Sequence, residues 1–271
     1  MVQRGVWVTD SDSGVVEFAD STVVIVGGTS GVGLAAATKF AEAGVPRIAL
    51  VGRNEDRGRA AEQSVRSAHS SVDVRFMAAD ANRAANAEAL VERILGAFGS
   101  IEILLNSTVG HAAPDLLKNI PLDQLESILV EQAMGPILMS RAVLPHMVER
   151  KRGVILNVAS DAAKLATPGE TVIGAAMAAI VMFTRALAIE GKRDGIRANA
   201  LTPSLIGGTL THQRMQESPF ASKLFEKAGK MASLGIAEAE DLADLALFLA
   251  SPAAKKITGQ AISANGGISA A

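Results

Sequence analysis

The chain has 271 residues, of which 49% are hydrophobic and 20% are charged. This length and apolar content suit one large domain with a substantial core and exclude a largely disordered protein. The net charge of −2 provides no basic surface of the kind that binds nucleic acid. Cysteine is absent, which excludes a disulfide framework, a thiolate metal site and a cysteine nucleophile. The 4 histidines are not paired at metal-ligand spacing, so no metal site is predicted.

No targeting segment is expected from the sequence. The first 18 residues contain Asp10, Asp12 and Glu17 and lack the apolar stretch of a signal peptide. Apolar runs are interrupted by Gly, Arg or Glu before they reach the roughly 20 residues of a membrane helix. We therefore expect a cytoplasmic protein that does not contact a membrane.

Residues 1–20 are polar and are predicted to form an N-terminal extension, followed by one α/β domain over residues 21–271. In this domain, short β-branched runs alternate with longer Ala- and Leu-rich segments of helical period. The alternation predicts a doubly wound, Rossmann-type parallel sheet of about seven strands with helices on both faces. Strands are expected at 22–26, 48–51, 74–78, 103–105, 153–158, 197–201 and 261–264. Helices are expected at 32–43, 57–67, 84–98, 122–150, 174–190 and 239–249.

Residues 203–236 interrupt this alternation with Gly207, Gly208, Pro219 and many polar residues. An insert near the carboxyl end of a strand usually shapes the ligand site of an open α/β sheet. We predict that this segment is a substrate lid, and its apolar residues favour a hydrophobic or acyl-type ligand. The lining residues expected are Leu205, Ile206, Met215, Phe220, Leu224 and Phe225.

A glycine-rich loop follows the first predicted strand and precedes the first predicted helix. It consists of Gly27-Gly28-Thr29-Ser30-Gly31-Val32-Gly33. Gly27 allows a tight turn, Gly31 lets backbone amides approach a pyrophosphate, and Gly33 permits close helix–sheet packing. The helix N-terminus adds free N–H groups and a positive potential for anions. In this context the pattern predicts a dinucleotide phosphate site, and a tight turn that binds nothing is the alternative.

The sequence resembles the short-chain dehydrogenase/reductase family over about residues 18–267. Its glycine loop has the family spacing at Gly27, Gly31 and Gly33, and further family landmarks follow in order. These landmarks are Ile103–Ser107, Leu144–Met147, Gly153–Ser160, Ile196–Asn199 and Ile257–Gln260. The resemblance implies a Rossmann-type fold, an NAD(P)(H) site and oxidoreductase chemistry that moves a hydride.

The end of the second strand bears on the choice of cofactor. An NAD-preferring site needs an acidic residue here to accept a hydrogen bond from the ribose 2′-hydroxyl. Gly52 takes that place, and the Arg53 that follows can pair with a 2′-phosphate. The sequence therefore favours NADP(H) over NAD(H), and the alternative is that Arg53 is only a solvated surface residue.

The resemblance also places Asp80 where the family accepts a hydrogen bond from the adenine amino group. The alternative role for Asp80 is the N-cap of the helix that follows. The complete predicted cofactor set is Gly27, Thr29, Ser30, Gly31, Val32, Gly33, Arg53, Asn54, Asp80, Ala81 and Asn106.

The usual chemistry of the family depends on a Tyr acid/base, a Lys that lowers the pKa of that Tyr, a Ser that binds the substrate oxygen and an Asn that holds a water. The resemblance places Ile173 at the Tyr position, Met177 at the Lys position, Ser160 at the Ser position and Gln132 at the Asn position. No Tyr occurs anywhere in the chain. Because Ile173 cannot exchange a proton and Met177 cannot carry charge, the standard mechanism is predicted to be lost, with Ser160 as a residual hydrogen-bond donor.

Other polar residues are candidate substitutes for the missing acid. His111 has a side chain suited to proton transfer near neutral pH, and the alternative is a solvent-facing loop histidine. Lys164 and Glu170 are weaker candidates, each with an exposed loop charge as the alternative. Val109 also departs from the family, because it puts a side chain where a glycine lets the cofactor approach.

The helix predicted over 174–190 is apolar all round, which indicates burial on more than one side. In the family that the sequence resembles, this helix and the one at 122–150 pair with their copies in a partner subunit. We therefore expect a homo- or hetero-dimer or tetramer. Three functions are open: an atypical oxidoreductase, a catalytically inactive subunit that supports an active family member, and a nucleotide-sensing module.

Overall fold

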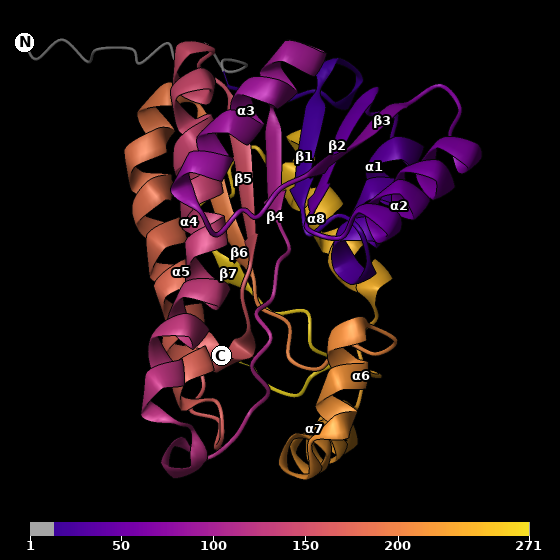
Figure 1. Cartoon of the computed structure of the whole chain (residues 1–271). Coiled ribbons are helices and arrows are strands. Elements are labelled where there is room, and N and C mark those ends of the chain that lie inside the picture. The colour runs from indigo at the N-terminus through magenta and orange to yellow at the C-terminus, as the bar shows by residue number, and fades with distance from the viewer. Residues whose placement is uncertain (1–13, 271) are drawn as a thin grey trace, which may run out of the picture.

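Parallel strands form the centre of the structure, a computed structural model in which residues 14–270 are described (Figure 1). Within these residues one seven-stranded sheet has the order β3-β2-β1-β4-β5-β6-β7. The strands are β1 (Thr22–Val26), β2 (Arg47–Gly52), β3 (Asp73–Ala78), β4 (Ile103–Asn106), β5 (Gly153–Val158), β6 (Ile196–Leu201) and β7 (Ala261–Ile262). The predicted doubly wound α/β fold is confirmed.

Helices cover both faces of the sheet (Figure 1). One face is packed against α1 (Gly31–Glu42), α2 (Glu55–Ala68) and α8 (Ala239–Ala250). The other face is packed against α3 (Ala84–Phe98), α4 (Leu125–Glu149) and α5 (Thr171–Gly191). Short 3-10 helices lie at Phe18–Asp20, Leu117–Asn119, Leu122–Gln124, Asp161–Ala163, Lys192–Asp194 and Pro252–Ala254. Because both faces are covered, the strands are near-continuous apolar runs.

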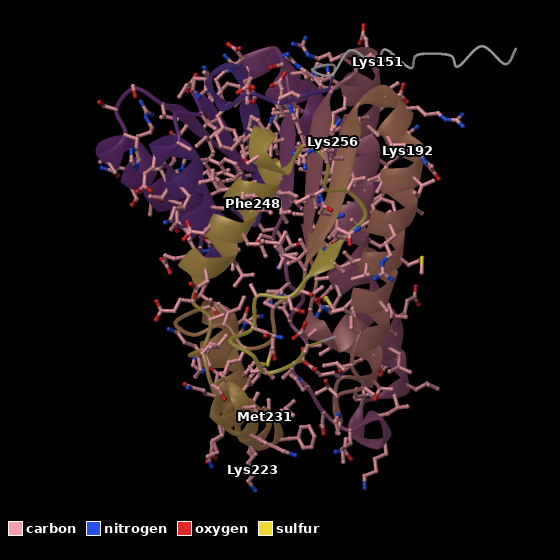
Figure 2. The ribbon with its side chains drawn as sticks, turned by 180° about the vertical axis from the view of Figure 1, so that it is seen from behind. Lys151, Lys192, Lys223, Met231, Phe248 and Lys256 are labelled. Atoms are coloured by element: carbon pink, nitrogen blue, oxygen red, sulfur yellow. The ribbon has the colours of Figure 1, made fainter. Side chains whose placement is uncertain are left out.

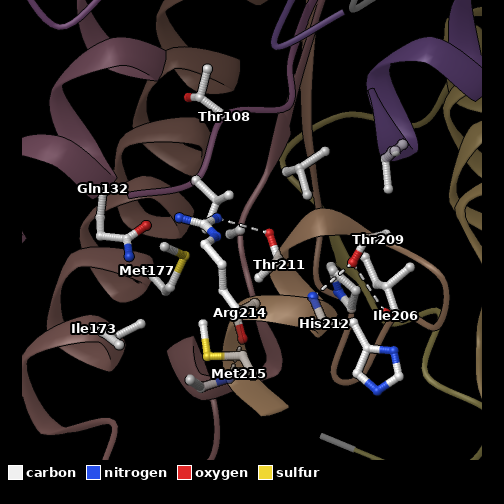
Figure 3. A pocket seen from close by; sticks show the side chains of 18 of the residues that line it. Thr108, Gln132, Ile173, Met177, Ile206, Thr209, Thr211, His212, Arg214 and Met215 are labelled. Carbon is white, nitrogen blue, oxygen red and sulfur yellow. Dashed lines mark hydrogen bonds between the residues drawn. The ribbon is translucent and has the colours of Figure 1, made fainter. Parts of the chain in front are cut away.

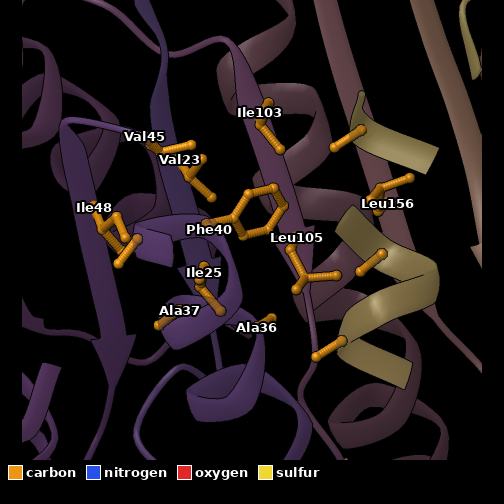
Figure 4. Packing of buried hydrophobic residues seen from close by; sticks show 14 of the residues in the cluster. Val23, Ile25, Ala36, Ala37, Phe40, Val45, Ile48, Ile103, Leu105 and Leu156 are labelled. Atoms are coloured by element: carbon orange, nitrogen blue, oxygen red, sulfur yellow. The ribbon is translucent and has the colours of Figure 1, made fainter. Parts of the chain in front are cut away.

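Phe40 is central to the core beneath α1, where its fully buried ring packs among residues of β1, β2 and β4 (Figure 4). Phe18 meets this ring edge-on, with ring centroids 5.8 Å apart. Val16 is also buried, so the last residues before β1 pack on the domain. The rest of the predicted N-terminal extension, residues 1–13, lies outside the described residues.

The order of the strands reverses between β1 and β4, which creates a crevice at their carboxyl ends. Val26 pairs with Asn106, and Asn106 pairs with Asn157, so β1, β4 and β5 end level with one another. The loops that leave these three strands therefore converge at one edge of the sheet.

The lid segment, residues 203–236, extends beyond this edge (Figure 1). It contains α6 (Leu210–Glu217) and α7 (Pro219–Met231), and its base is closed where the Gly207 amide donates to the Ala237 carbonyl at 2.8 Å. These helices were not predicted, although their N-caps are visible in the sequence. Thr209 accepts from the His212 amide at 3.1 Å, and Ser218 precedes a proline at the first helical position.

Helix α5 is the one helix within residues 14–270 that is long and apolar enough to cross a membrane by length and composition. The expectation that no apolar segment is long enough for a membrane helix is therefore wrong for α5. In the fold α5 packs along α4 and β6, and an apolar core helix passes the same test.

Candidate functional site

A cavity of about 870 Å³ lies at the carboxyl edge of the sheet, between the glycine loop, α4, α5 and the lid segment (Figure 3). Most of the predicted site residues line this cavity. They are Gly27, Thr29, Ser30, Gly31, Val32, Arg53, Asp80, Ala81, His111, Gln132, Ser160, Ile173 and Met177. The fold thus brings the predicted cofactor residues and the predicted catalytic positions to one site.

The glycine loop approaches other backbone so closely that a side chain is excluded at several of its positions, most severely at Gly27 and Gly33. A Cβ on Gly27 would lie 2.4 Å from the Ser107 carbonyl oxygen, and one on Gly33 would lie 2.3 Å from the Gly27 carbonyl oxygen. Gly27 has a φ of +85°, and its amide donates to the Val51 carbonyl at 2.9 Å. The loop is therefore held in one conformation by contacts that only glycine allows.

The first turn of α1 presents groups that suit an anion. Ser30 is the N-cap residue of α1, but its side chain makes no capping hydrogen bond. The first amides of the helix are therefore available to a phosphate. Thr108 Oγ1 and Asn82 Oδ1 also belong to cavity-lining residues, and both atoms are buried without a partner among the described residues. A nicotinamide dinucleotide, with its phosphates, ribose hydroxyls and amide, fits this set of unpaired groups.

Three residues of the predicted cofactor set do not line the cavity. Asn54 is the N-cap of α2, where its Oδ1 accepts from the Arg57 amide at 2.8 Å. Gly33 packs against Gly27, as described above. Asn106 is 0% exposed, and its Nδ2 donates to Asn157 Oδ1 at 2.8 Å. The structure thus gives these three residues roles in holding the walls of the site.

Two arginines lie at the end of β2 and the start of α2. The Nη2 of Arg53 lies 2.9 Å from Nε2 of His111. Arg57, which was not predicted, also lines the cavity, and its Nε donates to Thr29 Oγ1 at 3.2 Å. Neither arginine forms an ion pair within residues 14–270. The signal for Arg57 was its spacing of four residues from Arg53 at a helix start.

Asp80 lines the cavity and closes a turn before α3. Its Oδ1 accepts from the Asn82 amide at 3.1 Å, and its Oδ2 lies 3.5 Å from Nε of Arg83. The N-cap of α3 is Arg83. The alternative that Asp80 caps this helix is therefore wrong, because the helix begins too far along the chain.

The wall at the predicted catalytic positions is apolar. Met177 is 5% exposed and packs in a cluster with Ala133, Ala159 and Ala176, against which Ile173 is partly buried. Figure 3 shows Ile173 and Met177 on one side of the cavity, with Gln132 nearby on α4. The Oε1 of Gln132 accepts from the Gly110 amide at 3.0 Å. No side chain in this cluster can exchange a proton.

The loop after Ser160 carries two charges that the structure removes from solvent. Asp161 is buried and accepts hydrogen bonds from Ser263 Oγ and Ser269 Oγ, each at 2.8 Å. Lys164 Nζ lies 3.5 Å from Asp161 Oδ1, and its side chain is 12% exposed. The alternative that Lys164 is an exposed loop charge is therefore wrong. These contacts tie the C-terminal segment to the floor of the cavity.

Glu170 is a carboxylic acid on the cavity wall, half-buried at the start of α5. Burial raises the pKa of the Glu170 carboxyl above its usual value, and a hydrogen bond from Thr167 acts in the opposite direction. The alternative that Glu170 is a solvated loop acid is therefore wrong. Residues 14–270 contain no group of three His, Asp or Glu placed to hold a metal ion.

The lid segment supplies most of the apolar lining that was predicted, namely Leu205, Ile206, Met215, Leu224 and Phe225. Phe220 instead packs over Gly169, where an added Cβ would lie 2.3 Å from Phe220 Cε1. Arg214 was not predicted. Figure 3 shows its side chain extending from α6 into the cavity, whereas the His212 ring points the other way.

Comparisons with known proteins agree with this geometry. Residues 26–269 match a protein family described as Enoyl-(Acyl carrier protein) reductase. The 3-oxoacyl-[acyl-carrier-protein] reductase FabG of Chlamydia pneumoniae is 32% identical over 247 residues, which cover 91% of this chain and 96% of that protein. The 2-(R)-hydroxypropyl-CoM dehydrogenase of Xanthobacter autotrophicus is 29% identical, covering 91% of this chain and 98% of that protein. The crystal structure of levodione reductase superposes with a TM-score of 0.86 and 26% identity, covering 93% of this chain and 98% of that one.

Proposed function

This chain belongs to the short-chain dehydrogenase/reductase family, and we propose that it binds NADP(H) in preference to NAD(H) without the tyrosine–lysine mechanism usual in that family. The observation that carries the proposal is the pairing of an intact glycine loop with an apolar catalytic wall. Gly27 and the uncapped start of α1 provide the phosphate site. Ile173 and Met177 provide aliphatic and thioether groups where the family has an acid and a cation.

The preference for NADP(H) rests on charge at the end of β2. Gly52 has no carboxylate to bind a ribose 2′-hydroxyl, while Arg53 and Arg57 line the cavity without acidic partners in the described chain. A guanidinium forms a charge-assisted, bidentate pair with a phosphate. A 2′-phosphate therefore adds affinity here that the unphosphorylated cofactor lacks.

The lost groups have a large kinetic effect. A positioned general acid/base contributes about 10²–10⁴-fold to the rate of a step that moves a proton. At position 177 the missing cation also removes electrostatic stabilisation of the developing charge. The isolated chain is therefore expected to bind the cofactor with little turnover.

The surfaces of α4 and α5 support a role in an assembly. Leu129 and Val130 on α4, and Met182 and Ile189 on α5, are exposed, with 63% of Ile189 accessible. Burying such side chains in a partner is favourable. We propose that the chain is a cytoplasmic, non-catalytic subunit that joins a copy of itself or an active family member through 122–150 and 174–190. A nucleotide-sensing role uses the same binding without a catalytic partner.

A second candidate function is turnover with a substitute acid, and Glu170 favours it. This carboxyl lines the cavity and its raised pKa brings it closer to the range in which a general acid operates. His111 is the other candidate that lines the cavity, but its ring nitrogens lie against two arginines. Glu170 is therefore the stronger candidate of the two.

The test combines cofactor binding with turnover. Fluorescence titration with NADPH and NADH should show tighter binding of NADPH, and the Arg53→Gln variant should lose most of that preference. Arg59→Gln is the matched control, because Arg59 is also on the α2 side but pairs with Glu55 at 3.3 Å and does not line the cavity. Failure of the wild-type chain to bind either cofactor would refute the proposal.

Turnover is then measured with NADPH and a panel of carbonyl compounds. The isolated wild-type chain should show no turnover above background, and the Ser160→Ala variant should show none either. Turnover by the isolated chain that Glu170→Gln abolishes would establish the second candidate instead. Copurification from the native host identifies a partner subunit, and a homogeneous assembly of this chain alone would count against the mixed oligomer.

A further inference from the structure

Three basic side chains from distant parts of the chain meet at the boundary between the lid segment and the nucleotide side of the cavity. Arg53 follows β2, His111 follows β4, and Arg214 comes from α6. The Nη2 of Arg53 lies 2.9 Å from His111 Nε2, and the Nη1 of Arg214 lies 3.0 Å from His111 Nδ1. The imidazole is thus held between two guanidinium groups.

These contacts leave hydrogen-bonding capacity unused. A neutral imidazole has one acceptor nitrogen, so it accepts from only one of the two arginines at a time. The other guanidinium faces an N–H and has no acceptor in that direction. Arg214 also donates to Thr211 Oγ1 at 3.3 Å, but neither Arg53 nor Arg214 forms an ion pair within residues 14–270. The carboxylate beside the cluster is that of Glu131, which accepts from the His111 backbone amide at 3.2 Å.

The imidazole lies between the two guanidinium groups, and neither cation has a carboxylate partner within residues 14–270. An anion bound beside both arginines would offset their mutual repulsion. The chemistry that matches two forked donors and an imidazole is a phosphomonoester, which offers three acceptor oxygens and up to two negative charges. Arg53 and His111 are exposed, whereas Arg214 is half-buried and extends inward from α6 (Figure 3). The cluster therefore has the donor groups of an anion-binding site, and it lies where a bound anion would connect α6 to the nucleotide side of the cavity.

We propose that Arg214, Arg53 and His111 form a phosphomonoester site that holds α6 over the cavity when the ligand carries such a group. The inference deepens the proposed function and rests on it: Arg53 alone gives a preference for a 2′-phosphate, and Arg214 makes the lid part of that recognition. The phosphomonoester belongs either to the 2′-position of the dinucleotide or to a phosphorylated substrate. Arg214 is thus a specificity-determining residue that the sequence alone did not single out.

The first experiment compares ligands that differ by one phosphate. Calorimetric titration of the full chain uses 2′,5′-ADP against 5′-AMP, and coenzyme A against dephospho-coenzyme A. The wild-type chain should bind the phosphorylated member of a pair more tightly, and Arg214→Gln should reduce that advantage about tenfold, as expected for a lost charge-assisted contact. Lys223→Gln is the control, because it removes one positive charge from α7 at a residue that does not line the cavity (Figure 2).

The second measurement tests whether the bound phosphate holds α6 over the cavity. In the wild-type chain, hydrogen exchange of the amides in residues 209–217 should slow when 2′,5′-ADP binds and should slow less when 5′-AMP binds. In Arg214→Gln the two ligands should slow this exchange equally. An Arg214 effect confined to the coenzyme A pair would also support the site and would assign the phosphate to the substrate.

The outcomes separate the two proposals. The wild type and Arg214→Gln could prefer the phosphorylated ligands equally, while Arg53→Gln loses that preference. This result would overturn the role of Arg214 and leave the proposed function intact. No binding of any of the four ligands to the wild-type chain would overturn both. If Arg214→Gln unfolds, its circular dichroism spectrum will show it, and Arg214→Lys then takes its place, since a lysine keeps the charge and loses the fork.

Discussion

The hydroxyl oxygen of Ser160 accepts a hydrogen bond from the backbone amide of Ala162 at 3.2 Å. Ser160 thereby caps the 3-10 helix Asp161–Ala163 at the point where β5 leaves the sheet. The hydroxyl proton remains free to point into the cavity. The one residue that matches the family at the predicted catalytic positions therefore has a structural role that does not depend on catalysis.

Replacement of Ser160 by Ala should lower the free energy of unfolding by about 1 kcal/mol, because one backbone amide loses its cap. Ser160→Asp should retain most of the stability, since a carboxylate also accepts from that amide. Urea denaturation measures both. A Ser160→Ala variant as stable as the wild type would show that the cap contributes nothing.

Met177→Lys should destabilise the chain by about 2 kcal/mol. An ammonium group placed among Ala133, Ala159 and Ala176 loses hydration, although its flexible stem can lead it toward the cavity and limit the loss. Met177→Leu is the control and should change stability by less than about 1.5 kcal/mol, because volume and polarity are kept. Thermal and urea unfolding provide the comparison. Equal stability of the lysine variant would reveal an acceptor near position 177 and contradict the apolar character of this wall.

Gly33→Ala should prevent normal folding or lower stability by several kcal/mol. The added Cβ would lie 2.3 Å from the Gly27 carbonyl oxygen, and neither backbone segment can move without disturbing the loop. Gly96→Ala is the matched control on α3, where an added Cβ meets nothing within 4 Å. That variant should gain about 1 kcal/mol from helix propensity. Urea denaturation should show that Gly33→Ala lowers the free energy of unfolding and that Gly96→Ala raises it. A stable Gly33→Ala protein would refute the close packing.

Glu170 predicts a pH dependence of stability. Burial raises the pKa of this carboxyl in the folded chain, so the native state binds the proton more tightly than the unfolded state does. Stability from this group is fully present below the unfolded pKa and falls as the pH rises through the folded pKa. As the pH rises from about 4 toward 7, the free energy of unfolding of Glu170→Gln should therefore increase relative to that of the wild type. Near pH 4 the two proteins should differ least, and a difference that does not change with pH would contradict the raised pKa of this half-buried carboxyl.

Hydrophobic period and turn chemistry were enough to locate the strands and the larger helices, because each depends on residues within a few positions of one another. The glycine loop was recognisable for the same reason: Gly27 and Gly33 meet within a seven-residue turn. The two lid helices are not evident from hydrophobic period, although Thr209 and Ser218 carry capping signals, because α6 is short and polar.

The doubly wound sheet, the glycine loop and the absence of any tyrosine could all be read from the residues in order along the chain. Three side-chain contacts became visible only in the folded chain: Asn106 faces Asn157 rather than the cavity, Arg57 faces Thr29, and Arg214 meets a histidine 103 residues away. The physical reason is that backbone conformation follows from neighbours along the chain, whereas the partner of a polar side chain depends on which segments the packed layers place beside it.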